Sequence, residues 1–276
     1  MAASRRRFIK GGLVLLSGLF GGQALSRLAA SFGGRAAAAQ PATGAGAPSD
    51  DQARRRWAFA IDTTSCVGCG LCVEACKAEN QLPADPSFNR TWVERHVIAM
   101  DGSVFVDSPD GGIHGFPPES TAPGAAGQAV RQSFFMPRLC MQCANSPCVS
   151  ICPVSANSVT PDGVVLIDAD RCIGCGYCVV ACPYGARYIV PGGDGEASGR
   201  TPGVADKCTW CYHRIAAGRL PACVEVCPMG SRIFGDLNDP QSRLNGELKR
   251  RRSDVLRPEL GTRPRVYYLG LEVETG

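Results

Sequence analysis

The sequence predicts an α+β protein in which short β-hairpins, short helices and long loops form two lobes related by a pseudo-twofold axis. Three observations lead to this fold class. The 16 cysteines of the 276-residue chain fall into four groups of four. Short β-rich runs lead into and out of these groups. Glycine (33) and proline (20) make up about a fifth of the chain, so loops should be abundant and long helices are not expected.

The first 39 residues predict an export signal. The basic stretch SRRRFIK (residues 4–10) precedes 16 uncharged residues (11–26) and a run of small residues at 36–39. The uncharged run is shorter than the roughly 20 residues that span a bilayer. Paired arginines followed by an apolar pair and a lysine resemble the twin-arginine signal. We therefore expect a cleaved twin-arginine signal at 1–39, a periplasmic protein and no transmembrane helix in the mature chain. An ordinary Sec signal or a disordered basic tail is the alternative.

The net charge of +4 does not indicate binding to nucleic acid. Six basic residues and no acidic ones lie in residues 1–39, so the remaining chain carries a net charge of −2. Residues 40–56 lack apolar periodicity and predict a flexible linker. Ordered structure should therefore begin near Trp57.

Five short β-rich runs should form small two-stranded sheets beside the cysteine groups. They are Trp57 to Ile61, Val104 to Val106, Ser133 to Met136, Val164 to Ile167, and Tyr188 to Val190. Residues 107–132 and 192–203 predict surface loops. We place the main domain at 57–236 and expect residues 237–276 to be an extension that packs on this domain or on a partner.

The cysteine spacing indicates iron–sulfur ligation. The groups are Cys66, Cys69, Cys72 and Cys76 (one); Cys140, Cys143, Cys148 and Cys152 (two); Cys172, Cys175, Cys178 and Cys182 (three); and Cys208, Cys211, Cys223 and Cys227 (four). Groups one and three have the CxxCxxCxxxC spacing of 4Fe–4S ligands, and the middle gap widens to four residues in group two and eleven in group four. A proline follows the last cysteine in every group except group one, where Lys77 stands instead.

Cluster chemistry explains this spacing. Three thiolates must surround one face of a cube of iron and sulfide, which requires a tight loop with N–H groups turned inward. Gly68 and Gly70, like Gly174 and Gly176, lie between ligands, where a positive φ or a close approach to sulfur is needed. The fourth cysteine follows at a helical offset and the proline should end that turn. We therefore predict four 4Fe–4S clusters, with all sixteen cysteines as iron ligands. The twin-arginine route exports folded proteins, so the signal and the cysteine groups are mutually consistent.

Disulfides and zinc sites are the competing interpretations of so many cysteines. Neither needs cysteines at i, i+3, i+6 and i+10 with glycines between them. The segment that begins at Cys208 does not match the haem-attachment motif CxxCH, because Tyr212 separates Cys211 from His213. With three histidines in the chain (His96, His114, His213), we expect no catalytic residue, and we expect His213 to have a local structural role.

Four segments resemble a known family. They read WAFAIDTTSCVGCGLCVEACKAEN, LCMQCANSPCVSICPVSA, DGVVLIDADRCIGCGYCVVACPYGARY and KCTWCYHRIAAGRLPACVEVCPMGSRIFGDLNDP. They are similar to the four-cluster, ferredoxin-like iron–sulfur subunits of membrane-associated molybdopterin oxidoreductases. The tail DVLRPELGTRPRVYYLG looks closest to the polysulfide and tetrathionate reductase type.

The resemblance implies a role without a catalytic site on this chain. Such subunits relay single electrons between a molybdopterin catalytic subunit and a polytopic, quinone-reactive membrane subunit. A free-standing periplasmic multicluster ferredoxin, or a carrier linked to a hydrogenase, is the alternative function.

The pairing of the groups follows from their order and from the family. In two-cluster ferredoxins the fourth cysteine of a run reaches the other cluster. Groups two and three are close enough in sequence to pair locally as one lobe, and groups one and four then pair across the domain, as in the resembled family. The predicted ligand sets are Cys66, Cys69, Cys72 and Cys227; Cys208, Cys211, Cys223 and Cys76; Cys140, Cys143, Cys148 and Cys182; and Cys172, Cys175, Cys178 and Cys152.

Overall fold

The computed structural model of the protein describes residues 55–83, 85–118, 127–192 and 201–271. The predicted signal (1–39), nearly all of the predicted linker (40–56) and most of the predicted loop at 192–203 lie outside these residues. Within them the predicted α+β class is confirmed, because the strands form small sheets and the helices are short.

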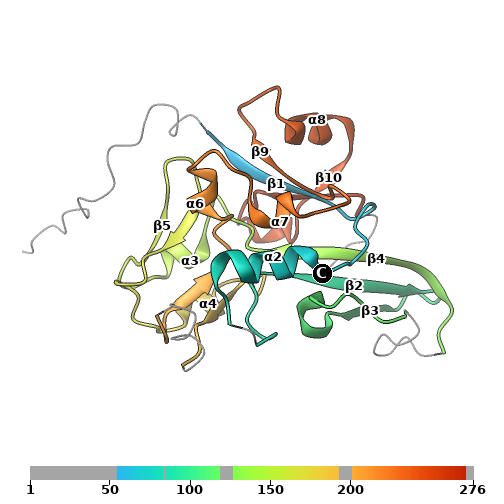
Figure 1. The fold of residues 1–276 in the computed structure, drawn as a ribbon, viewed down its shortest axis with the longest axis horizontal. Helices are drawn as coiled ribbons and strands as arrows, with labels where there is room; N and C mark the ends of the chain where they lie inside the picture. Colours follow the sequence, from blue (N-terminus) through green and yellow to red (C-terminus); the bar gives the residue numbers. More distant parts are fainter. Residues whose placement is uncertain (1–54, 84, 119–126, 193–200, 272–276) are drawn as a thin grey trace, which may run out of the picture. The chain divides into compact units, whose positions relative to one another are not determined.

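The largest sheet joins the two ends of the described chain (Figure 1). Its strand order is β10 (Ser253–Asp254), β11 (Val266–Leu269), β1 (Trp57–Asp62) and β9 (Arg232–Asp236). Strand β1 pairs in parallel with β11 and antiparallel with β9. The segment that we expected to be an extension therefore supplies two strands of this sheet.

Strand β1 is buried on both faces. Alternate side chains of a strand point to opposite faces. Phe59 enters the main core, whereas Ala58 and Ala60 pack with Leu244 of helix α8 (Arg243–Arg250). A strand covered on both sides reads as a continuous apolar run, which is why this element was visible in the sequence.

A second sheet has the strand order β3 (Val104–Asp107), β2 (Thr91–Ala99) and β4 (Val130–Leu139). Strand β2 was not predicted, because charged residues interrupt its apolar pattern. One of them, Arg95, is buried through an ion pair with Asp107 at 2.6 Å. The structure also differs from the predicted loop at 107–132, since its first residue belongs to β3 and its last three belong to β4.

Two antiparallel hairpins carry the cysteine-rich middle of the chain. They are β5 (Asn157–Val159) with β6 (Val165–Ile167), and β7 (Arg187–Ile189) with β8 (Ala205–Lys207). These are two-stranded sheets of the predicted kind. The remaining strands form larger sheets than predicted, because distant segments add strands to them.

The third cysteine of every group is the second residue of a short helix. The helices are α2 (Leu71–Asn80), α3 (Pro147–Ser150), α4 (Tyr177–Val180) and α7 (Ala222–Glu225). Helix α6 (Tyr212–Ile215) occupies the widened gap of group four, and two 3-10 turns are η2 (Pro109–Gly112) and η4 (Pro258–Leu260). In groups two to four the helix ends before the fourth cysteine and its proline, as predicted. Across the described ranges, no helix combines the length and apolarity that crossing a membrane would take.

Cysteines form part of the main hydrophobic core. Phe59, Met136 and Trp210 belong to one buried cluster together with five cysteines. Those cysteines are Cys72, Cys140, Cys143, Cys208 and Cys223. Cysteine groups one, two and four therefore contribute directly to the main core.

Candidate iron–sulfur cluster sites

Each cysteine group begins with the same backbone turn. The second residue after the first cysteine is left-handed in all four groups, with φ of 66° at Gly68, 44° at Gln142, 67° at Gly174 and 54° at Trp210. Glycine adopts this conformation at little cost, whereas other residues are strained by it. The four groups thus begin with copies of one loop, although the gap between the second and third cysteines is longer in groups two and four.

Buried contacts hold the two non-glycine residues in this conformation. The Gln142 side chain donates to the carbonyl oxygen of Cys208 and accepts from the N–H of Val165, both at 2.8 Å. The Trp210 ring packs against Phe59 and other core residues, and it is 1% exposed. These contacts offset the strain that glycine avoids in the other two groups.

Two of the predicted glycines also lie against other backbone. A Cβ added to Gly70 would lie 2.3 Å from the carbonyl oxygen of Ile113, and one added to Gly174 would lie 2.1 Å from that of Gly203. The positive φ expected at these glycines is confirmed. The close approach is to backbone carbonyls, whereas we had also considered an approach to sulfur.

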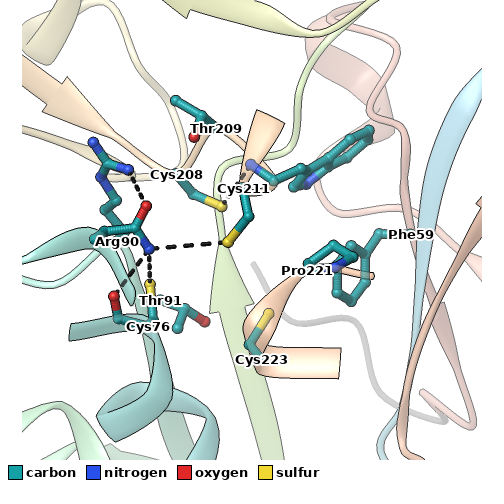
Figure 2. A pocket seen from close by; sticks show the side chains of 11 residues that line it. Phe59, Cys76, Arg90, Thr91, Cys208, Thr209, Cys211, Pro221 and Cys223 are labelled. Atoms are coloured by element: carbon teal, nitrogen blue, oxygen red, sulfur yellow. Dashed lines mark hydrogen bonds between the residues drawn. The ribbon is translucent and has the colours of Figure 1, made fainter. Parts of the chain in front are cut away.

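One cavity is lined by four buried cysteines (Figure 2), namely Cys76, Cys208, Cys211 and Cys223. We call it site two, after its place in the order of sites along the molecule. Burial raises the pKa of the Cys208 thiol to about 12, and the charges of Cys223 and Cys211 add to the shift. Protein groups alone therefore disfavour thiolates here. A cationic metal centre reverses this preference, because coordination deprotonates thiols.

Polar side chains complete site two. The Asn80 amide nitrogen lies 3.6 Å from the Cys76 sulfur and 3.9 Å from the Cys211 sulfur. Arg90 donates to the Asn80 side-chain oxygen at 2.6 Å, which turns the amide nitrogen toward the sulfurs. Asp206 binds the same guanidinium through two hydrogen bonds of 2.9 and 2.7 Å. Hydrogen bonds to sulfur are one means of tuning a cluster potential.

Site one is a second cavity, lined by Cys66, Cys69, Cys72 and Cys227. Cys69 is exposed and Cys72 is buried. Burial raises the pKa of the Cys66 thiol to about 11. The buried side chain of Arg232 also lines this cavity. The last cysteine of group four thus lies with three cysteines of group one.

Site three gathers Cys140, Cys143, Cys148 and Cys182. Burial raises the pKa of the Cys143 thiol to about 12, and the charges of the other three cysteines raise it further. Charges act in this way only over short distances. The fourth cysteine of group three therefore lies beside three cysteines of group two.

Site four is formed by Cys172, Cys175 and Cys178 on the loop that leads into α4, and Cys152 is the fourth ligand that the sequence predicts for it. The backbone N–H of Ala205 points to the Cys172 sulfur at 3.5 Å. Cys175 is exposed and Cys178 is buried. Cys152 follows α3, which packs against α4.

The turn after the fourth cysteine supplies inward N–H groups. The N–H of Ala156 lies 3.2 Å from the Cys152 sulfur. Although burial acts in the opposite direction, such bonds lower the pKa of the Cys152 and Cys227 thiols below the ordinary value. Stabilised thiolates are the ligand form that iron requires.

The four sites form one row, in which each site lies close to the next. At sites one and two, Cys72 lies close enough to Cys223 to act on its thiol. At sites two and three, Cys140 acts in the same way on Cys208. Arg187 bonds to a sulfur of site three and lies beside a cysteine of site four. The order along the molecule is therefore one, two, three, four.

Two residues singled out in the sequence have structural roles. His213 pairs with Glu79 at 2.7 Å, so it links α6 to α2 as a local structural residue. Lys77 donates to three carbonyl oxygens of the loop 83–88 at 2.9 to 3.1 Å. Group one has no proline because α2 continues past Cys76, and Lys77 then fixes the following loop.

The donor chemistry fits iron–sulfur clusters. All sixteen cysteines lie in the described residues, and none of them forms a disulfide. In the ranges that the structure describes, no three Cys, His, Asp or Glu side chains meet closely enough to share one metal ion. A 4Fe–4S cube binds each thiolate at a different iron, so its ligands stand further apart than those of a single ion.

Comparisons with known proteins agree with this chemistry. A family described as "4Fe-4S binding domain" matches residues 57–78, and one described as "4Fe-4S dicluster domain" matches residues 131–237. The first match contains group one, and the second contains groups two to four.

Curated relatives extend over most of the chain. The B component of tetrathionate reductase from Salmonella typhimurium is 41% identical over 221 residues, which cover 79% of this chain and 74% of that protein. The chain belongs to this family of iron–sulfur subunits. The B component of polysulfide reductase from Wolinella succinogenes is another relative of this chain. It is 35% identical over 216 residues, which cover 77% of this chain and 93% of that protein. A putative dimethyl sulfoxide reductase iron–sulfur subunit from Halobacterium salinarum is 37% identical, over 80% and 81%.

The family resemblance drawn from the cysteine segments is thereby confirmed. The protein is an iron–sulfur electron-transfer subunit of a respiratory reductase, and its sixteen cysteines match four 4Fe–4S clusters.

Among the residues that sequence reasoning missed, four stand at repeated positions of the cysteine groups of this iron–sulfur subunit. Gln142 and Trp210 occupy the turn position that glycine fills in the other groups, and alignment of the four groups on their first cysteine would have revealed them. Arg187 and Arg232 each stand five residues after a fourth cysteine, in the pattern CPxxxR. That repeated arginine was a signal available in the sequence.

Proposed function

We propose that this chain relays single electrons along sites one to four, between a quinone-reactive membrane subunit and a molybdopterin catalytic subunit of a periplasmic oxidoreductase. One observation carries the proposal: the two inner sites contain no exposed cysteine, whereas each of the two outer sites contains one, Cys69 or Cys175. Bound clusters supply the one-electron chemistry. The chain holds them in order, covers the inner pair and leaves the outer pair accessible.

The proposed ligand sets are those predicted from the sequence. Shared cavities support Cys76 with group four and Cys227 with group one. The mutual charge effects at site three support Cys182 with group two. The packing of α3 against α4 supports the reciprocal placement of Cys152 with group three.

The outer sites have the surface expected of docking positions. Val67 is 53% exposed beside Cys69, and Ile173 and Tyr177 are 64% and 58% exposed beside Cys175. Apolar residues at the centre of an interface exclude water. By family resemblance, we assign the lobe of groups one and four to the catalytic partner and the lobe of groups two and three to the membrane partner.

A redox titration followed by EPR tests the relay. We expect four 4Fe–4S signals, and we expect the protein to co-purify with its partners from solubilised membranes. A chain that stays soluble and monomeric when its partners are produced would contradict the relay and favour a free-standing ferredoxin. Fewer than four clusters in fully loaded protein would contradict the ligand sets.

We further propose export in the folded state by the twin-arginine route. The support is the SRRRFIK segment together with cysteines that need their metal before they leave the cytoplasm. Changing both Arg5 and Arg6 to lysine should leave cluster-containing protein in the cytoplasm. Normal amounts in the periplasm would contradict this route, and a variant with Lys10 changed to arginine is the control.

A further inference from the structure

Two arginines occupy the same place in the two lobes. Arg187 follows Cys182 by five residues and begins β7, and Arg232 follows Cys227 by five residues and begins β9. The corresponding residue of group two is Asn157. Since each fourth cysteine crosses toward the partner group of its lobe, the strand after it starts between the two sites of that lobe.

Arg232 is buried between sites one and two. It is 1% exposed and lines site one. Its Nη2 donates to the Thr91 hydroxyl at 2.9 Å, whereas its Nε and Nη1 are buried and have no oxygen or nitrogen acceptor among the described residues. Burial opposes its charge, but Cys72 and Cys223, one from each site, keep its pKa above the ordinary value.

Arg187 is the counterpart between sites three and four. It is 4% exposed. Its Nη1 donates to the Asn157 side-chain oxygen at 2.8 Å, and its Nη2 donates to the Cys148 sulfur at 2.9 Å. Cys178 of site four is also close enough to act on its charge. The two arginines are thus related by the symmetry of the lobes.

Neither arginine has a carboxylate partner among the residues that the structure describes. Arg90 differs, because Asp206 binds it through two hydrogen bonds. A guanidinium cannot lose its proton in a protein, and an uncompensated buried charge is costly. Anionic clusters provide the compensation, since a cube with four thiolates carries about −2 when oxidised and about −3 when reduced.

We propose that Arg232 and Arg187 are the inter-cluster cations of their lobes, and that each raises the reduction potentials of the two clusters beside it. A fixed positive charge stabilises the reduced cluster more than the oxidised one, because the reduced cluster carries one more negative charge. Each arginine therefore sets the potentials of its own lobe. The inference rests on the proposed ligand sets.

The test is a redox titration monitored by EPR, with iron and sulfide analysis, on the full chain in its complex. Arg232→Met should lower the midpoint potentials at sites one and two and leave those at sites three and four unchanged, and Arg187→Met should do the reverse. Arg232→Lys and Arg187→Lys keep the charge and should shift the potentials less. Arg250→Met removes an exposed charge on α8 and is the matched control.

Two results would overturn the inference. One is unchanged potentials in a methionine variant that retains all its iron, and the other is an equal shift in both lobes. If a methionine variant loses a cluster, the lysine variant decides. If the lysine variant retains its clusters, with potentials close to those of the natural protein, the result supports the role of the positive charge. Loss of iron from both the methionine and the lysine variant would show that the arginine has a purely structural role. If the proposed ligand sets are wrong, this is seen separately, because a cysteine-to-serine variant then removes the EPR signal of a different cluster from the one predicted.

Discussion

Sites two and four are built on the same loop but differ in how the protein covers them. All four cysteines of site two are buried, whereas Cys175 of site four is exposed. In group four the second and third cysteines are separated by eleven residues, which include α6, and Trp210 places the loop of this group in the main core. Site four has Val180 and Tyr177 beside it, at 89% and 58% exposed.

The difference shows how one repeated motif can serve two purposes. A buried cluster is insulated from solvent and oxidants, and burial is one determinant of its potential. An exposed cluster can be approached by a partner. The local motif fixes the ligands, and the surrounding packing decides whether a site is internal or terminal.

Of the changes considered, removing a ligand from site two should have the largest effect on that site. With Cys76→Ser we expect the EPR signal of the cluster held by Cys208, Cys211 and Cys223 to be lost or altered, and iron to fall from about 16 to about 12 per chain. The signal of site one should stay nearly intact. Loss of the site-one signal instead would contradict the pairing of groups one and four.

The packing around the two sites can be compared with one pair of variants. Trp210→Ala should lower the free energy of unfolding by about 3–5 kcal/mol, because it empties a fully buried position. Tyr177→Ala on the exposed loop should change it by less than about 0.5 kcal/mol. Melting temperatures of the loaded protein measure both. Equal effects would mean that the sites are equally covered.

Glycines in the two outer loops give a finer comparison. Gly70 and Gly176 have φ of 80° and 76°, so alanine should cost about 1–2 kcal/mol at either position. Only at Gly70 would the added Cβ also meet backbone, at Ile113. We expect Gly70→Ala to incorporate less iron than Gly176→Ala. Matching iron contents would show that the backbone at Ile113 moves freely.

The smallest effect concerns access to the clusters. In the natural protein, an iron chelator should bleach the EPR signals of sites one and four several-fold faster than those of sites two and three, a rate ratio worth about 1 kcal/mol. The order of loss is measured by freezing samples at intervals. Earlier loss of the inner signals would remove the distinction between internal and terminal sites.

Several local features could be predicted because they depend on neighbouring residues alone. The CxxCxxC spacing indicated the cofactor, and the glycines between ligands indicated left-handed turns. Strand β1 appeared as an apolar run. Strand β2 could not be found in this way, because Arg95 is buried only through Asp107 on the adjacent strand.

The sequence alone determined the chemistry of this protein: sixteen thiols in four loops that suit iron–sulfur clusters, and the family to which they belong. The tertiary structure decided which loops meet, that β11 from the far end of the chain pairs with β1, and that Arg187 and Arg232 lie between sites. The physical reason is the range of the interactions. Spacing and backbone conformation act over a few residues, whereas burial and charge compensation depend on segments that only folding brings together.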